Sequence, residues 1–274
     1  MIRISNLSFS YGKQPLFKGF NLEIHRNQTL LITGINGVGK STLLRLIAGV
    51  LLPKEGEITY EGESIYKIKK RIGFISDSMS LYNDMKVSEI ISFHMNMFGI
   101  EEFHDSLIKH TKISYSQTVG KLSIGQRVLL HLNLILSQNP DIILIDEVLP
   151  SIDAYLRDLF LNELLNVISK REVTVVMVNL NFYDIENIVD RVILLKNGLI
   201  AVDEPIDVLK CRVKKLICEK PPENLPVIFN QRFGDNFESF IYPFDNEKDK
   251  IKGELVELDL TDIIKAFIGG EYVN

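Results

Sequence analysis

Apolar and polar positions alternate along the first third of the chain, which predicts β-strands joined by turns. Residues 20–24 alternate in the manner of a strand with one buried face. The denser apolar run 29–33 predicts a strand that is buried on both faces. A helical pattern at 43–50 follows, and we expect it to end before a turn at 53–56 that leads into a further strand at 57–60.

The middle of the chain is mainly helical in pattern. Helical periodicity runs from about Val87 to Gln138, and the stretch Ile124–Leu136 carries so few charges that we expect it to be buried on most faces. Strand patterns return at Asp141–Ile145 and Val173–Val178, with a helix-like segment, Ala154–Lys170, between them. A strand, a helix and a strand in this order predict a crossover unit of a parallel sheet.

The last part of the chain has a different pattern. Asn197-Gly198 between two apolar runs predicts a hairpin. After about Lys210, prolines and lysines interrupt the periodicity, and short strand patterns precede one closing helix at Asp262–Phe267. We therefore expect residues 208–274 to form a small appended α+β unit behind a larger α/β domain.

The composition and charge indicate which classes of partner to expect. The chain has 274 residues, with 31 Lys and Arg against 36 Asp and Glu, so its formal net charge is −5. Because no basic surface is indicated, we expect no nucleic acid partner. No apolar run approaches the ~20 residues of a membrane-spanning helix, and the first residues lack a signal-peptide pattern, so we expect a soluble chain that meets a membrane only through a partner.

The histidines and cysteines do not indicate a metal site. Two cysteines, Cys211 and Cys218, are too few for a disulfide scaffold and suit a reducing compartment. None of the five histidines has metal-ligand spacing, and we expect surface or core positions for His25, His94, His104, His110 and His131.

Residues 34–42 read Gly-Ile-Asn-Gly-Val-Gly-Lys-Ser-Thr and fit the phosphate-loop pattern G-x-x-x-x-G-K-[ST] between a buried strand and a helix. The glycines let backbone N–H groups turn inward around an anion, and the helix N-terminus adds a partial positive charge. Lys40 can reach the β- and γ-phosphates of a nucleotide, and the Ser41 hydroxyl is placed to ligate Mg²⁺. We expect phosphate contacts from Gly34, Asn36, Gly37, Gly39, Lys40, Ser41 and Thr42.

A second chemical pattern follows the apolar run 142–145, where Asp146 and Glu147 stand side by side. Ligands of open α/β sheets bind at the carboxyl ends of the strands, so both acids are expected there. Asp146 would hold Mg²⁺ directly or through water, and Glu147 would polarise the attacking water as a general base. Together with the phosphate loop, this pair predicts a nucleotide hydrolase with Lys40 and Glu147 as catalytic residues.

The segment Leu122-Ser123-Ile124-Gly125-Gln126 resembles the Leu-Ser-Gly-Gly-Gln signature of the nucleotide-binding subunits of ATP-binding cassette (ABC) transporters. The resemblance implies that two cassettes enclose two ATP molecules, and that Ser123, Gly125 and Gln126 face the ATP held by the other subunit. Ile124 replaces the first signature glycine, which is tolerable if Gly125 supplies the close backbone approach.

The resemblance covers roughly residues 1–207. It implies a P-loop NTPase cassette with a parallel-sheet core, an N-terminal antiparallel sheet and a helical subdomain over about 80–136. It also implies that Tyr11 stacks on the adenine ring of ATP, and that Asp153 lies in a loop that communicates across the dimer.

The chain departs from the pattern of the family at two further positions. Asp77 stands where the family usually has Gln, and a carboxylate can ligate Mg²⁺ at least as well as an amide can. Leu180 stands at the position of the switch histidine that contacts the γ-phosphate, and leucine cannot donate a hydrogen bond to it. Asn179 or Asn181 can substitute as donor; otherwise hydrolysis is slow or depends on a partner cassette.

The expected function is that of an ATP-binding and ATP-hydrolysing subunit, with ATP and Mg²⁺ as cofactors. It would power a separate transmembrane permease subunit from the cytoplasmic face of the cell membrane, paired with a second cassette as a homodimer or heterodimer. Residues 258–271 resemble the tails of bacterial exporter ATPases, which favours export. The alternatives are an importer ATPase, a soluble cassette ATPase without a membrane partner, and a regulatory cassette with little turnover.

The methionines around the helical subdomain have two interpretations. Met79, Met85, Met95 and Met97 suit a core, but methionine-rich surfaces also adapt to partners. The resemblance implies that this region contacts the membrane subunit, so Ser78–Met85 and Met95–Phe98 are the alternative contact segments.

Overall fold

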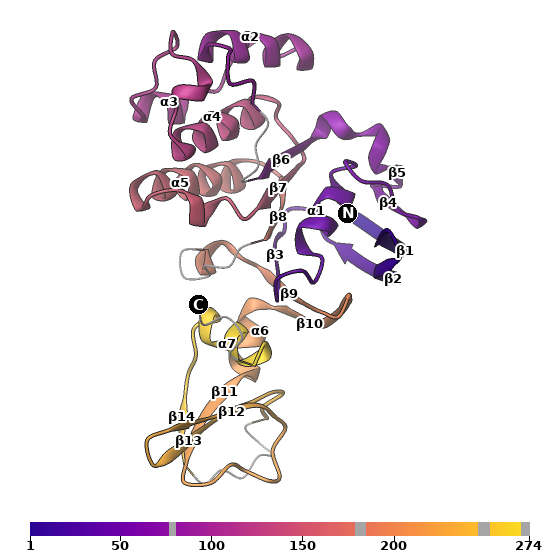
Figure 1. Cartoon of the computed structure of the whole chain (residues 1–274), viewed down its shortest axis with the longest axis vertical. Helices are drawn as coiled ribbons and strands as arrows, with labels where there is room; N and C mark the ends of the chain where they lie inside the picture. Colours follow the sequence, from indigo (N-terminus) through magenta and orange to yellow (C-terminus); the bar gives the residue numbers. More distant parts are fainter. Residues whose placement is uncertain (77–80, 179–184, 246–252, 270–274) are drawn as a thin grey trace.

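The computed structural model describes residues 1–76, 81–178, 185–245 and 253–269, which form an elongated molecule with three β-sheets (Figure 1). The N-terminal sheet is antiparallel and has the strand order β2-β1-β4-β5. Its strands are β1 (Ile2–Tyr11), β2 (Gln14–Ile24), β4 (Glu55–Tyr60) and β5 (Glu63–Ser64).

The central sheet has six strands in the order β10-β9-β3-β8-β7-β6. Four neighbouring pairs are parallel, and β10 pairs antiparallel to β9 through the expected hairpin. Asn197 and Gly198 both have positive φ in that turn, which explains the Asn-Gly pair. The strands are β3 (Thr29–Gly34), β6 (Ile72–Ser76), β7 (Ile142–Asp146), β8 (Thr174–Val178), β9 (Arg191–Lys196) and β10 (Leu199–Pro205).

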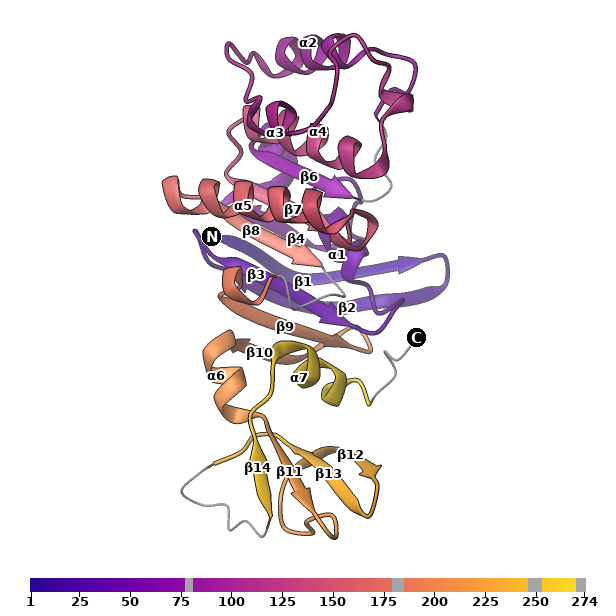
Figure 2. The ribbon, with the colours of Figure 1, turned by 90° about the vertical axis from the view of Figure 1, so that its left-hand side faces the viewer.

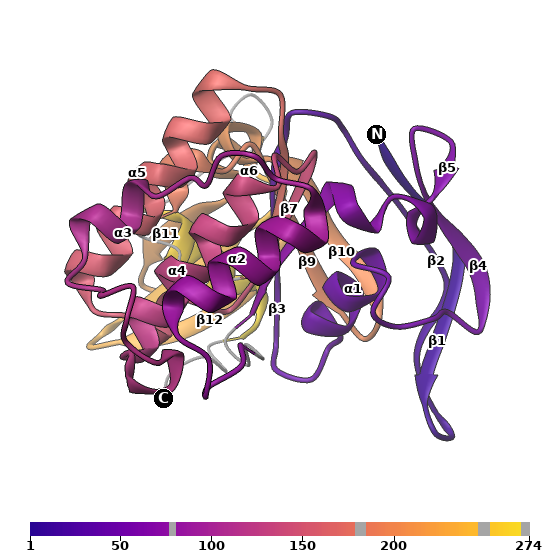
Figure 3. The same ribbon diagram turned by 90° about the horizontal axis from the view of Figure 1, so that it is seen from above.

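Helices cover both faces of the central sheet. On one face, α1 (Lys40–Ile47) lies between this sheet and the antiparallel sheet, and all three share one apolar core (Figure 3). On the other face, α4 (Ile124–Ser137) and α5 (Ala154–Lys170) pack on the sheet in a second core. The alternation along β3 explains this division, because Leu30 belongs to the first core and Leu31 to the second. The expected α/β architecture with a parallel core is confirmed.

The helical region at one end of the molecule contains α2 (Val87–Phe98), α3 (Ser106–His110) and one side of α4 around a third apolar cluster (Figure 2). Met85 and Met95 pack against this cluster, whereas Met97 is 51% exposed. Met79 lies outside the described residues. Two of the four methionines therefore serve the core.

The C-terminal region lies at the opposite end and contains a four-stranded antiparallel sheet of order β12-β13-β11-β14 (Figure 2). Its two helices, α6 (Ile206–Arg212) and α7 (Leu260–Phe267), belong to the apolar core of the central sheet, and α6 spans the expected boundary at 207/208. The strands are β11 (Lys214–Cys218), β12 (Val227–Phe233), β13 (Asn236–Ile241) and β14 (Glu254–Val256). The division of the chain into 1–207 and 208–274 stays a prediction.

Two local expectations were wrong, and glycine explains both. Helix α1 ends at Ile47 rather than continuing to Val50, because Gly49 adopts a left-handed conformation with φ of +66°. Strand β4 starts at Glu55, so Gly56 lies inside the strand rather than in the preceding turn. A Cβ on Gly56 would stand 2.4 Å from the carbonyl oxygen of Asn6 in β1, so only glycine allows this close approach.

Among the described residues, no helix combines the length and the apolar character needed to cross a membrane. The same part of the chain contains no group of three or more His, Cys, Asp or Glu side chains arranged to hold a metal ion.

Candidate nucleotide-binding site

The phosphate loop connects β3 to α1, and its backbone requires glycine at several positions. Gly34, Gly37 and Gly39 have φ values of +143°, +79° and +111°, which residues with a Cβ rarely adopt. A Cβ on Gly34 would also stand 2.4 Å from the carbonyl oxygen of Leu195, and one on Gly39 would stand 2.7 Å from Phe17. Packing of the loop against β9 and β2 therefore fixes its shape.

Lys40 is held beneath this loop. Its ammonium donates hydrogen bonds to the carbonyl oxygens of Gly34 at 2.8 Å and Ile35 at 3.1 Å, and its side chain is only 4% exposed. Burial lowers the pKa of Lys40, and the carboxylates of Glu147 and Asp146 oppose that shift. The cation is thus held at the loop by the loop's own carbonyl oxygens.

Ser41 and Asp146 bring together two oxygen ligands. The Ser41 hydroxyl donates to Asp146 Oδ1 at 2.7 Å, and Asp146 is only 3% exposed at the end of β7. Hydroxyl and carboxylate oxygens are the ligand types that Mg²⁺ prefers, so these side chains fit the expected ion. The structure brings these two predicted metal ligands into contact.

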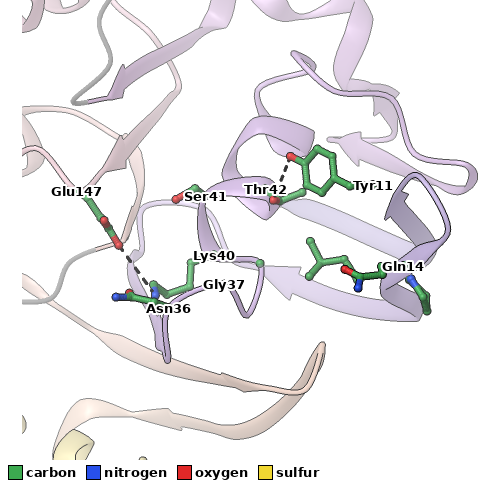
Figure 4. Close-up of a pocket in the computed structure, with 11 residues that line it drawn as sticks. Tyr11, Gln14, Asn36, Gly37, Lys40, Ser41, Thr42 and Glu147 are labelled. Atoms are coloured by element: carbon green, nitrogen blue, oxygen red, sulfur yellow. Dashed lines mark hydrogen bonds and ion pairs between the residues drawn. The ribbon is translucent and has the colours of Figure 1, made fainter. Parts of the chain in front are cut away.

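Glu147 directly follows β7 and has a φ of +52°, which is uncommon for a residue with a side chain. Its backbone N–H donates to the carbonyl oxygen of Val178 at 3.0 Å, which ties the turn to β8. The carboxylate stands 3.9 Å from Lys40 Nζ and is 33% exposed (Figure 4). Strained backbone of this kind gathers at functional sites, and here it brings the carboxylate to the pocket wall.

An open cavity of about 580 Å³ joins these groups, which is within the usual range for a small-molecule site (Figure 4). Tyr11 lines the cavity and is 54% exposed, and its hydroxyl lies 3.3 Å from Thr42 Oγ1. The sequence reasoning missed Gln14, Pro15 and Leu16, which also line the cavity. A signal was present, since the short turn after Tyr11 makes Gln14 its cross-strand partner. The complete lining is Tyr11, Gln14, Pro15, Leu16, Asn36, Gly37, Gly39, Lys40, Ser41, Thr42 and Glu147.

Three further predicted residues, Ser123, Gln126 and Asp153, line a second cavity of about 410 Å³, which shares no lining residue with the first. Ser123 caps α4 by accepting from the Gln126 N–H at 3.2 Å, and Gln126 Oε1 accepts from the Ser123 N–H at 3.0 Å. Asp153 caps α5 by accepting from the Leu156 N–H at 3.1 Å. The structure thus groups Ser123, Gln126 and Asp153 together and apart from the phosphate loop.

Gly125 is buried, and a Cβ there would stand 2.5 Å from Leu156 Cδ1 in α5, so a side chain at this position would displace the end of Leu156. The expected approach of Gly125 to ATP stays a prediction. Ile124, its neighbour, is 54% exposed. Four other residues of the sequence argument, Asp77, Asn179, Leu180 and Asn181, lie outside the described residues.

Residues 17–149 match the family model described as ABC transporter. The probable sulfate/thiosulfate import ATP-binding protein CysA of Chlorella vulgaris is 30% identical over 213 residues, which cover 73% of this chain and 89% of that protein. The spermidine/putrescine import ATP-binding protein PotA of Pasteurella multocida is 28% identical over 74% of this chain, but the chain spans only 58% of that longer protein.

The solved structures include similar folds. The dimeric ATP-binding cassette MJ0796, in a post-hydrolysis state bound to ADP and Pi, has a TM-score of 0.65 and 22% identity, with 75% of this chain and 99% of that chain covered. At this identity the likeness concerns the fold.

Proposed function

The chain belongs to the ATP-binding subunits of ABC transporters, and from this premise we propose that it hydrolyses ATP with the phosphate loop, Asp146 and Glu147. Subunits of this family bind ATP, pair with a second cassette and work with separate transmembrane permease subunits. The observation that carries the proposal is the convergence of Lys40, Ser41 and Glu147 on one open cavity, with Asp146 bonded to Ser41.

Each residue has a distinct role in the proposed reaction. Lys40 exchanges its hydrogen bonds to the loop carbonyls for bonds to the β- and γ-phosphates and neutralises the developing charge. Glu147 orients a water molecule and accepts its proton as that water attacks the γ-phosphate. Mg²⁺ bound by Ser41 and Asp146 would supply further positive charge at the phosphates.

The working unit in this proposal is a pair of cassettes. Ser123, Gln126 and Asp153 share a cavity that is separate from the phosphate-loop cavity of the same chain, which supports a role toward ATP held by a second cassette. The pair would lie at the inner face of a membrane through a permease subunit. Ser78–Met85 and Met95–Phe98 are the proposed contact segments. Residues 78–80 lie outside the described residues, and Met97 offers an exposed apolar side chain in the second segment.

Import and export are not equally well supported as the direction of transport. The relatives CysA and PotA carry the word import in their names, which favours an importer. The exporter interpretation rests on the short C-terminal segment 258–271 alone. We therefore place import ahead of export. Affinity purification from native membranes tests the transport role itself: a polytopic membrane subunit is expected, and recovery of soluble partners only would contradict it.

Turnover is proposed to be low, because Leu180 stands at the switch position in the sequence and its side chain cannot bind phosphate. The variant Leu180→His should raise the rate of ATP hydrolysis. An unchanged rate would show that this position does not limit turnover.

The metal role of Ser41 has a direct test. Mg²⁺ should strengthen ATP binding to the wild-type chain, and Ser41→Ala should remove most of that gain because one ligand is lost. Titration of ATP with Mg²⁺ or with EDTA measures it. A Ser41→Ala chain that keeps the full effect of Mg²⁺ would exclude the proposed metal site.

A further inference from the structure

The second cavity contains a cation that the signature pattern does not account for. Besides Ser123, Gln126 and Asp153, its lining includes Lys112, on the segment that follows α3. The remaining lining residues are His110, Thr111, Tyr155 and Leu156. Lys112 lies outside every motif on which the sequence argument rested.

The backbone around Lys112 is anchored on both sides. The Thr111 N–H donates to the carbonyl oxygen of Leu107 at 3.1 Å, and the Thr111 hydroxyl donates to that of Ile108 at 3.1 Å. On the other side, Ile113 is 7% exposed within the apolar cluster of the helical region. The lysine is therefore held at the rim of the cavity by a fixed main chain.

The ammonium of Lys112 is available to a ligand. Within the described residues it makes neither an ion pair nor a hydrogen bond, and the side chain is exposed. Its neighbour Lys109 differs, because it is paired with Asp105 at 2.8 Å across one helical turn. Of these two lysines on one short segment, only Lys112 lines the cavity.

The charges in the cavity indicate a role for the Lys112 ammonium. The Asp153 carboxylate lies in the same cavity, so a triphosphate that approaches Ser123 and Gln126 meets a negative charge. A lysine in the same cavity opposes that repulsion and can donate to phosphate oxygens. Tyr11 and Lys40 line the phosphate-loop cavity and not this one, because the two cavities share no lining residue.

We propose that Lys112 binds the phosphate chain of the ATP held by the second cassette and thereby determines how readily ATP joins the two cassettes. The inference rests on the proposed function, in which this cavity faces the nucleotide of the partner. The affinity of a single cassette for ATP does not depend on Lys112 in this proposal. The ATP-dependent closure of the pair does depend on it.

Size-exclusion chromatography over a series of Mg-ATP concentrations tests the proposal in a Glu147→Gln background, which retains ATP. Lys112→Gln should raise the ATP concentration for half-dimerisation about tenfold, the effect of losing one charge-assisted hydrogen bond per site. Lys112→Arg should restore dimerisation, and the matched control Lys109→Gln should leave it unchanged. Binding of a fluorescent ATP analogue at protein concentrations too low for pairing should be the same in all four chains.

The outcomes are distinguishable. The role of Lys112 would be overturned, while the proposed function stands, by either of two results. One is an ATP concentration for half-dimerisation of Lys112→Gln within twofold of that of its parent. The other is an equal increase of that concentration in Lys109→Gln. A weakened affinity of the single cassette in Lys112→Gln would also overturn this role. If the Glu147→Gln parent itself forms no ATP-dependent dimer, the proposed pairing fails, and this inference fails with it.

Discussion

The contact between β6 and α4 is tight enough to predict the cost of adding one methyl group. Gly73 lies in β6 with an ordinary backbone conformation, so alanine is allowed there by φ and ψ. A Cβ on Gly73 would stand only 2.2 Å from Ile135 Cγ2, however, and Ile135 is 3% exposed in the core. Overpacking of this kind costs about 1–3 kcal/mol. We expect Gly73→Ala to destabilise the protein by about 2 kcal/mol.

A double-mutant cycle shows whether that contact is the cause. Ile135→Ala should cost about 2–5 kcal/mol by leaving a cavity. In the double variant the new methyl group enters that cavity, so the total loss should be about 1–2 kcal/mol smaller than the sum of the single losses. Urea unfolding followed by circular dichroism gives all three free energies. The reasoning would be refuted if the free energy of unfolding of Gly73→Ala lay within about 0.5 kcal/mol of the wild-type value, which is the scatter of surface substitutions. Strictly additive losses of unfolding free energy in the double variant would also refute it.

Three further predictions concern the nucleotide site and the helical region. Lys40→Ala should weaken ATP binding by about 3 kcal/mol, or roughly 100-fold, because the phosphates lose charge-assisted hydrogen bonds. A calorimetric loss of ATP affinity of less than about fivefold would contradict this role of Lys40. Tyr11→Ala should weaken ATP binding about tenfold through loss of stacking on adenine, whereas Tyr11→Phe should bind as wild type does, and equal losses in both variants would exclude stacking. Burial lowers the pKa of His131 from 6.5 to about 4, with a smaller contribution from His94. The unfolded chain therefore binds this proton first, so stability should fall by up to about 3 kcal/mol as the pH drops from 6.5 to 4. His131→Gln should flatten the pH dependence of the urea midpoint; a His131→Gln chain with the wild-type slope would contradict this.

The residues of the phosphate-loop site were predictable because their chemistry is local in sequence. Gly34, Gly37 and Gly39 need their conformations within one loop, and the loop joins a strand and a helix that periodicity alone indicates. Asp146 arrives beside Ser41 because parallel strands end at one edge of the sheet. Local pattern and the rule for parallel sheets were sufficient here.

Other features depend on contacts between distant segments, which periodicity does not report. Gly56 is needed where β4 meets the backbone of Asn6, and Gly125 lies where α4 meets Leu156. Leu16 enters the nucleotide cavity only through the register of β2 on β1. The helices α6 and α7 contribute to the core of the central sheet, a contact between segments far apart in the sequence. Each of these outcomes follows from tertiary packing.

The most direct test of the account is Mg²⁺-dependent ATP hydrolysis by the purified chain, measured beside Glu147→Gln. Lys40, Ser41 and Glu147 line one cavity, where Lys40 pairs with Glu147 and Ser41 donates a hydrogen bond to Asp146. We expect slow phosphate release by the wild-type chain that requires Mg²⁺, and at least a 100-fold lower rate in Glu147→Gln, since general-base catalysis contributes about 10²–10⁴-fold. Hydrolysis by Glu147→Gln at the wild-type rate would contradict the central claim.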